Sequence, residues 1–271
     1  MLHQDAWQKH RAIQRIALLI VIALPVVAFA AAEAGPQLPE ILTAREGEKW
    51  ELVFSDEFNG ATADLDANWN FQNAKQGHIL CSRWRENVIA EKGLCRILNK
   101  KEQRGGQEWT AGSMSTKKEF KYGFFEARYR YGNATGLNNS FWMMTRGKTG
   151  VPGKFEIDID EGHFPNEVNT NLHDWGPKHT GKGKAKTFDG QNMANDFHVF
   201  SLLWTEKELA WFVDGREIRR EDNKLCHDQA PVILSSAIMK WAGDVTDKID
   251  GTAMEADWVR VYQIQNATSA K

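Results

Sequence analysis

Short apolar runs separated by Gly, Asn and Asp make up most of the chain after residue 49, and helical spacing of apolar residues is nearly absent. Glu91-Lys92-Gly93 and Asp214-Gly215 separate pairs of runs in the way that hairpin turns do. Many strands without intervening helices predict an all-β antiparallel sandwich or barrel. The expected strands are residues 50–54, 87–90, 94–98, 124–131, 140–144, 155–160, 167–175, 197–204, 208–213, 231–240 and 256–263.

Two of these runs alternate strictly and show what their faces carry, because successive side chains of a strand point to opposite faces. In residues 167–175 one face is Val168, Thr170 and Leu172, and the other is polar and aromatic: Asn169, Asn171, His173 and Trp175. In residues 155–160 Ile157 and Ile159 are expected in the core, and the acids are expected on the opposite face: Glu156, Asp158 and Asp160. An acidic face beside a polar and aromatic one is typical of the lining of a cleft.

The run from Glu156 to Glu161 (EIDIDE) packs four carboxylates into six residues. A solvated acidic edge would explain it, whereas an EF-hand loop would not, because no register supplies both the required Gly and the required Glu. Cleavage of a glycosidic bond with retention needs two carboxyl groups about 5–5.5 Å apart. Strict alternation turns Glu161 toward the core, so this chemistry requires a β-bulge between Asp158 and Glu161.

Composition narrows the function classes. The 271 residues are 42% hydrophobic and carry a formal net charge of −2, which argues against disorder and against a broad basic surface for nucleic acid. Tryptophan is abundant, with 11 residues, and indicates either a Trp-rich core or a surface that stacks on flat ligands. Cys81, Cys95 and Cys226 allow one disulfide and a free thiol, or three buried thiols.

The acidic run resembles the bulged E-x-D-x-x-E signature of glycoside hydrolase family 16, which includes laminarinases, agarases, porphyranases and kappa-carrageenases. Four further stretches are similar to family strands: residues 50–60, 109–128, 197–215 and 257–262. The resemblance implies a concanavalin A-like jelly roll with an open concave cleft and a retaining double-displacement mechanism. It implies Glu156 as nucleophile, Glu161 as general acid/base and Asp158 between them.

A glycan cleft needs aromatic platforms among hydrogen-bonding side chains. Trp142 matches the family tryptophan beneath the sugar next to the scissile bond, and the strand-face argument adds others. The expected substrate-binding residues are Trp142, Trp175, His173, Asn171, Asn139, Trp109 and Trp241. Four tryptophans in scaffold-like strands are expected in the core: Trp50, Trp204, Trp211 and Trp258.

Residues 136–142 (GLNNSFW) depart from the laminarinase stretch and are nearer the agarase-like form. This favours a β-linked galactan of agar, porphyran or carrageenan type as substrate. An endo-β-1,3-glucanase, a non-catalytic lectin-like glycan-binding module and a transglycosylase are the alternatives. The lysine run at Lys178, Lys182, Lys184 and Lys186 is either a solvated loop or a contact for a sulfated chain.

The chemistry requires no cofactor. The resemblance implies one structural calcium on the convex side, with the Asp257 side chain and backbone oxygens near Glu57 and Gly93 as ligands. A polysaccharide is the expected partner, with no nucleic acid and no stable oligomer.

Residues 1–34 carry basic residues ahead of an apolar run and end in two A-x-A sites, after residues 30 and 34. This pattern predicts a cleaved signal peptide, with an uncleaved anchor as the alternative. We expect a lead-in at residues 35–49, a single glycoside hydrolase catalytic domain at 50–265 and a tail at 266–271. The mature protein is then secreted or periplasmic, without stable membrane insertion.

Overall fold

The computed structural model describes residues 36–265. The chain divides into two units, residues 1–37 and 38–271, and the account below concerns the second. The predicted signal peptide at residues 1–34 and the tail at 266–271 lie outside the described residues. Within the described part, no helix has the length and apolar character needed to span a membrane.

Two antiparallel sheets of eight strands each form the framework of residues 38–265, and the pattern of the sequence predicts such an all-β arrangement. The sheet that carries the acidic run is called the cleft sheet. Its strands are, in spatial order, β13 (Thr180–Gly181), β12 (Glu167–Asp174), β11 (Phe155–His163), β10 (Leu137–Met144), β18 (Val232–Ile238), β8 (Ser113–Thr116) and β2 (Trp69–Phe71), with β14 (Lys184–Thr187) beside β12. The second sheet contains β17 (Arg216–Asp222), β16 (Glu208–Val213), β15 (His198–Trp204), β9 (Gly123–Arg130), β19 (Ala253–Ile264), β5 (Leu94–Leu98) and β4 (Val88–Glu91), with β1 (Trp50–Asp56) beside β19.

A smaller sheet, which the sequence pattern did not predict, has three strands. It consists of β3 (Cys81–Arg83), β7 (Gln107–Ala111) and β6 (Lys100–Arg104), with β3 parallel to β7. These strands carry many polar and charged residues and lack the apolar alternation by which strands are predicted. The helical pieces are all short: α1 (Glu40–Thr43), η1 (Thr62–Asp64), α2 (Leu65–Asn68), η2 (Arg85–Asn87), η3 (Lys240–Ala242) and η4 (Asp247–Ile249).

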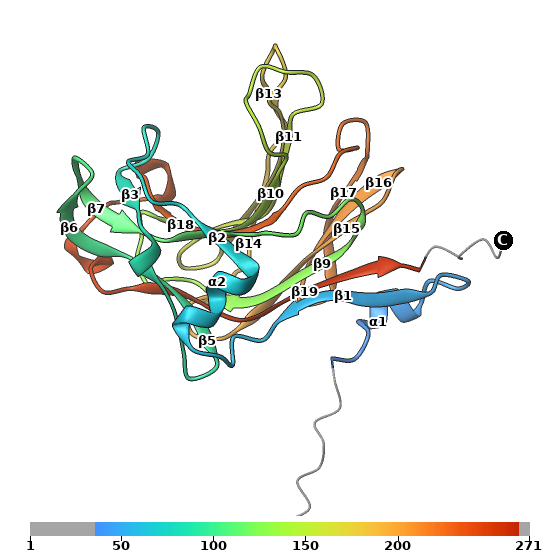
Figure 1. The fold of residues 1–271 in the computed structure, drawn as a ribbon, viewed down its shortest axis with the longest axis horizontal. Helices are drawn as coiled ribbons and strands as arrows, with labels where there is room; N and C mark the ends of the chain where they lie inside the picture. Colours follow the sequence, from blue (N-terminus) through green and yellow to red (C-terminus); the bar gives the residue numbers. More distant parts are fainter. Residues whose placement is uncertain (1–35, 266–271) are drawn as a thin grey trace, which may run out of the picture. The chain divides into compact units, whose positions relative to one another are not determined.

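Strand β19, the last strand in sequence, pairs with β1, the first, in the second sheet. It pairs with β9 along one edge and with β5 and β1 on the other, and Figure 1 shows it (red) beside β1 (blue). The predicted hairpin turns are present, because Lys92-Gly93 and Asp214-Gly215 all have left-handed φ angles of 49–74°. Such two-residue turns match the twist of the strands they connect.

The main core lies between the two large sheets and contains Trp69, Trp204 and Trp211, all nearly inaccessible to solvent. Trp50 is buried in a second cluster with Tyr262, whereas Trp258 is only partly buried. Truncation of a buried tryptophan typically costs about 3–5 kcal/mol. These four buried tryptophans therefore stabilise the fold. All three cysteines are buried free thiols, which corresponds to the second of the two alternatives left open by the sequence.

Candidate active site

The predicted β-bulge lies in β11. Asp158 faces Asn171 of β12 and Glu161 faces Asn169, so three steps along β11 correspond to two along β12. The register with β10 shifts at the same point, between Phe141 and Trp142. The prediction of a bulge between Asp158 and Glu161 is therefore confirmed, and the extra residue brings Glu161 back to the face that carries Glu156.

The same bulge turns Asp160 into the core, so the expectation that it shares a face with Glu156 and Asp158 is wrong. Asp160 is fully buried and accepts hydrogen bonds from the hydroxyls of Tyr129 and Tyr131. Tyr131 lies so close to Gly162 that a Cβ there would be 2.2 Å from the ring. One inserted residue reverses the alternation for every residue after it.

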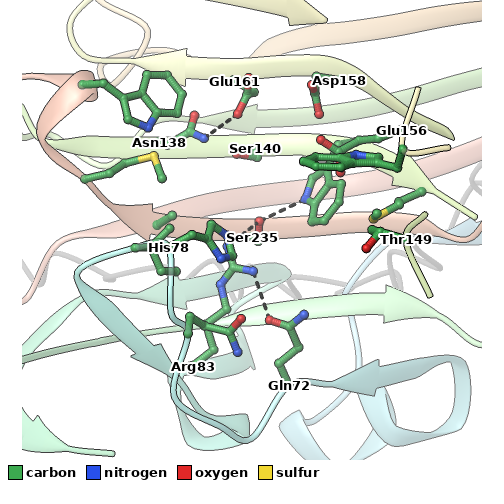
Figure 2. A pocket seen from close by; sticks show the side chains of 18 residues that line it. Gln72, His78, Arg83, Asn138, Ser140, Thr149, Glu156, Asp158, Glu161 and Ser235 are labelled. Carbon is green, nitrogen blue, oxygen red and sulfur yellow. Dashed lines mark hydrogen bonds between the residues drawn. The ribbon is translucent and has the colours of Figure 1, made fainter. Parts of the chain in front are cut away.

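A cavity of about 510 Å³ lies over the cleft sheet. Figure 2 shows Glu156, Asp158 and Glu161 along one wall and Gln72, His78 and Arg83 on the other. The acids come from β11, and the opposite wall comes from the segment between β2 and β3. The cavity size lies within the range of ordinary ligand sites.

Each acid of the wall has a distinct set of contacts. Asn138 Nδ2 donates to Glu161 Oε1 at 2.8 Å, and Trp175 Nε1 donates to Glu156 Oε2 at 3.3 Å. Asp158 Oδ2 has no hydrogen-bond partner among the described residues. The nearest imidazole is His173, whose Nε2 is 3.5 Å from Asp158 Oδ2 and 3.8 Å from Glu156 Oε1.

Burial raises the pKa of all three carboxyls, because the ionised form loses its hydration. For Glu156, burial and the charge of Asp158 together raise the pKa to about 8. The pKa of Asp158 is raised well above its ordinary value by burial and by Glu161, and Arg219 opposes this only in part. The site therefore holds protons at neutral pH that carboxyls in water would have lost.

Three of the four predicted tryptophan platforms line this cavity. Trp142 donates through Nε1 to Ser235 Oγ at 3.1 Å, and Trp241 is 55% exposed at the rim. Trp175 lines the cavity and stacks on His179, with ring centroids 3.9 Å apart.

His173 and Asn171 line an adjoining cavity of about 480 Å³, which shares Glu161 and Trp241 with the first. The two cavities thus form successive parts of one cleft on either side of Glu161.

Trp109 and Asn139 are not on the cleft, and both expectations are corrected. Trp109 is 4% exposed and belongs to a buried cluster with Cys81 and Ala111. Asn139 is fully buried, accepts from the Gly132 amide at 2.8 Å and donates to Gly162 O at 3.0 Å. The even-numbered residues of β10 face the cavity, so Asn139 points the opposite way.

Several cavity residues were not predicted. Asn138 and Ser140 share the face of Trp142, so alternation extended back from Trp142 would have found both. Gln72, His78 and Arg83 carry no pattern that sequence reasoning could use, because they reach the cavity through the packing of a separate segment.

The one side-chain ligand implied for calcium, Asp257, is engaged by an arginine, and the calcium site with backbone oxygens near Glu57 and Gly93 stays a prediction. Asp257 is paired with Arg128, and both carboxylate oxygens of Glu57 accept from Arg260 at 2.9 and 2.8 Å. Gly93 lies in the β4–β5 turn. Calcium prefers several free oxygen ligands, whereas these carboxylates already neutralise guanidinium groups. In the described part of the chain, the one group of three close metal-ligating side chains is Glu156, Asp158 and His173 of the cleft itself.

Comparisons with known proteins agree with this geometry. A family model described as glycosyl hydrolases family 16 matches residues 68–260. The laminarinase catalytic domain from Thermotoga maritima MSB8 superposes with a TM-score of 0.72 at 30% identity, covering 81% of this chain and 100% of that chain.

Two curated relatives differ in what their names state. Glucan endo-1,3-beta-glucosidase A1 of Niallia circulans is 25% identical over 79% of this chain, and the match spans only 38% of that relative's length. Kappa-carrageenase of Pseudoalteromonas carrageenovora is 27% identical over 92% of this chain and 75% of its own length.

Proposed function

Because the chain belongs to glycosyl hydrolases family 16, we propose that it is an endo-acting, retaining glycoside hydrolase of a β-linked polysaccharide. The observation that carries the proposal is the bulge in β11, which puts Glu156 and Glu161 on one cavity wall with Asp158 between them. Two carboxyls on one wall can act as nucleophile and as acid on the same glycosidic bond. Export through a signal peptide at residues 1–34 is part of the proposal.

In the proposed mechanism Glu156 attacks the anomeric carbon while Glu161 protonates the leaving oxygen. Glu161 then removes a proton from the water that hydrolyses the covalent intermediate. The hydrogen bonds from Trp175 and Asn138 favour the ionised forms of Glu156 and Glu161. Asp158 has no such donor, so it holds a proton of the resting cluster and can return it to its neighbours.

A purely glycan-binding module gains nothing from three close carboxyls that repel one another, of which Asp158 is buried and Glu156 and Glu161 are partly buried, because their burial costs folding free energy. Hydrolysis is therefore favoured over a lectin-like role. A transglycosylase would use the same residues and differ only in which acceptor takes the intermediate.

For the substrate, we propose a β-galactan of agar, porphyran or carrageenan type, from the agarase-like residues 138–142 and the kappa-carrageenase relative. Endo-β-1,3-glucan cleavage is the second candidate, supported by the likeness to a laminarinase domain.

The test is incubation with laminarin, mixed-linkage β-glucan, agarose, porphyran and carrageenan, read as new reducing ends. Glu156→Ala and Glu161→Ala should each abolish release while their melting curves stay cooperative. On an aryl β-glycoside, whose phenolate leaves without protonation, added azide should restore turnover and give glycosyl azides of opposite anomeric configuration in the two variants, because it replaces the nucleophile in one and the water in the other. Wild-type turnover by either variant would refute the assignment of roles.

A further inference from the structure

We propose that Arg83 recognises an acidic substituent, a sulfate ester or a carboxylate, on the polysaccharide bound in the cavity. The inference rests on the proposed function for the identity of the bound molecule as a polysaccharide. It adds the chemistry that selects among polysaccharides.

Arg83 is the last residue of β3 and reaches the cavity from the wall opposite the acids, as Figure 2 shows. It is only 6% exposed. Nη1 donates to Gln72 Oε1 at 3.0 Å and Nη2 to Ser235 Oγ at 3.3 Å, and both acceptors are neutral. Nε is buried and has no partner among the described residues. A buried guanidinium normally pairs with a carboxylate, because an unpaired charge is costly to bury.

The surroundings of Arg83 hold a single positive charge. Burial and the charge of Arg83 both lower the pKa of His78, so His78 is neutral at neutral pH. The acids that line the cavity, Glu156, Asp158 and Glu161, stand on the other wall. The cavity thus has a cation without a counterion on one side, and on the other side acids that have no arginine or lysine in a salt bridge among the described residues.

An acidic group on the sugar would supply the counterion that Arg83 lacks. The guanidinium fork matches the paired oxygens of a sulfate or carboxylate. Ser235 Oγ accepts from both Arg83 and Trp142, so its own hydroxyl hydrogen remains for an acceptor in the cavity. An anionic substituent would be attracted by Arg83 and repelled by the acids, which fixes the orientation of its sugar over Trp142.

Three of the four lysines after Trp175 have other contacts. Lys182 pairs with Glu221, Lys184 Nζ donates to Ile218 O at 3.3 Å, and Lys186 Nζ lies 5.4 Å from the Phe188 ring centroid. Arg83 differs from them, because its charge is buried at the cavity and lacks an acid.

The experiment compares polysaccharides that share a backbone and differ in the acidic group. One pair is kappa-carrageenan and its chemically desulfated form, and the other is a uronate-bearing β-glycan and its carboxyl-reduced form. We expect wild type to show a kcat/KM at least about tenfold higher on the acidic member of one pair, and Arg83→Gln to lose that preference, so that its kcat/KM falls more on the acidic member than on the neutral one. The pair that shows the effect distinguishes sulfate from carboxylate. Arg96→Gln, on the second sheet, should change neither ratio.

Arg83→Lys retains the charge but lacks the fork, so its preference should fall between those of wild type and Arg83→Gln. Equal losses of kcat/KM on both members of a pair would mean that Arg83 only supports the wall, and this would overturn the inference. An unchanged preference in the variants would overturn it as well. If Arg83→Gln has no cooperative melting transition, Arg83→Lys alone decides.

Affinity electrophoresis separates this inference from the proposed function. If wild type cleaves nothing, yet acidic polysaccharide in the gel retards it and retardation is lost in the folded Arg83 variant, the proposed hydrolase is refuted and the anion site stands. Cleavage without any Arg83-dependent discrimination refutes the anion site and leaves the hydrolase. The absence of both cleavage and Arg83-dependent retardation refutes both.

Discussion

Acids and arginines are arranged in opposite ways on the two large sheets. On and beside the second sheet, three acids pair with four arginines, and we call this set the charged ladder. Its members are Glu255 with Arg96 and Arg130, Asp257 with Arg128, and Glu57 with Arg260. On the cleft sheet, the wall with Glu156, Asp158 and Glu161 has no arginine or lysine in a salt bridge with it among the described residues, and Arg83 faces them across the cavity.

The difference between the two sheets shows how an ion-pair partner affects the energetics of a carboxylate. The partly exposed pairs of the ladder each contribute about 0–1 kcal/mol to stability. Burial raises the pKa of each acid of the cleft, so these carboxyls lose their protons at higher pH than carboxyls in water. The cleft arrangement costs stability, and in the proposed mechanism it makes a nucleophile and a proton donor available in the same cavity.

The largest difference should appear in activity. Glu161→Gln removes the proton that the leaving oxygen needs, so kcat should fall by about 10²–10⁴-fold on an unactivated polysaccharide. Glu57→Gln, which breaks a pair of the ladder, should leave kcat within about twofold. Initial rates of reducing-end release measure both. Similar losses of kcat in the two variants would contradict the assignment of catalysis to the acids of the cleft sheet.

The aromatic residues extend the comparison to binding. Trp142→Ala should lower kcat/KM by about tenfold, because the sugar loses its stacking surface. Trp258→Ala is the matched variant, since that ring lies on the second sheet with the Arg260 guanidinium 4.1 Å from its centroid. It should change the melting temperature and not KM. An effect of Trp258→Ala on KM would contradict the assignment of the cavity as the substrate site.

The pH dependence of stability should reveal the raised pKa of Glu156. Between pH 4.5 and about 8 the folded chain holds a proton on Glu156 that the unfolded chain has released, so this group makes the free energy of unfolding fall as pH rises. Glu156→Gln removes that dependence and should raise the melting temperature at pH 8 relative to wild type, by about 2–4 °C or more. At pH 4.5 the two proteins should melt alike. Urea titrations at both pH values provide the check, and a variant less stable than wild type at pH 8 would contradict the raised pKa.

The smallest effect concerns calcium. Because Asp257 and Glu57 are paired with arginines, EDTA or added calcium should shift the melting temperature by less than about 1 °C. Asp257→Asn should behave like wild type toward both reagents. A calcium-dependent rise that disappears in Asp257→Asn would show that the ion displaces Arg128.

The sequence determined most strands of the two large sheets, two hairpin turns and the identity of the acidic wall. Alternation placed Ile157, Ile159 and Val168 in the core, where they are buried. It also indicated the bulge, since the chemistry required Glu161 on a face that strict alternation denied it. These properties are local, because side-chain alternation and turn geometry depend on neighbouring residues.

The tertiary structure decided which side chains meet across the cavity. The bulge sent Asp160 to the tyrosines of β9 and its following residue, and the packing of strands buried Trp109 and turned Asn139 away from the cleft. Arg83 comes from a parallel strand of a small charged sheet and meets Ser235, 152 residues later in the chain. No periodicity along the chain encodes such a contact, because it depends on how separate sheets pack and not on the alternation within one strand.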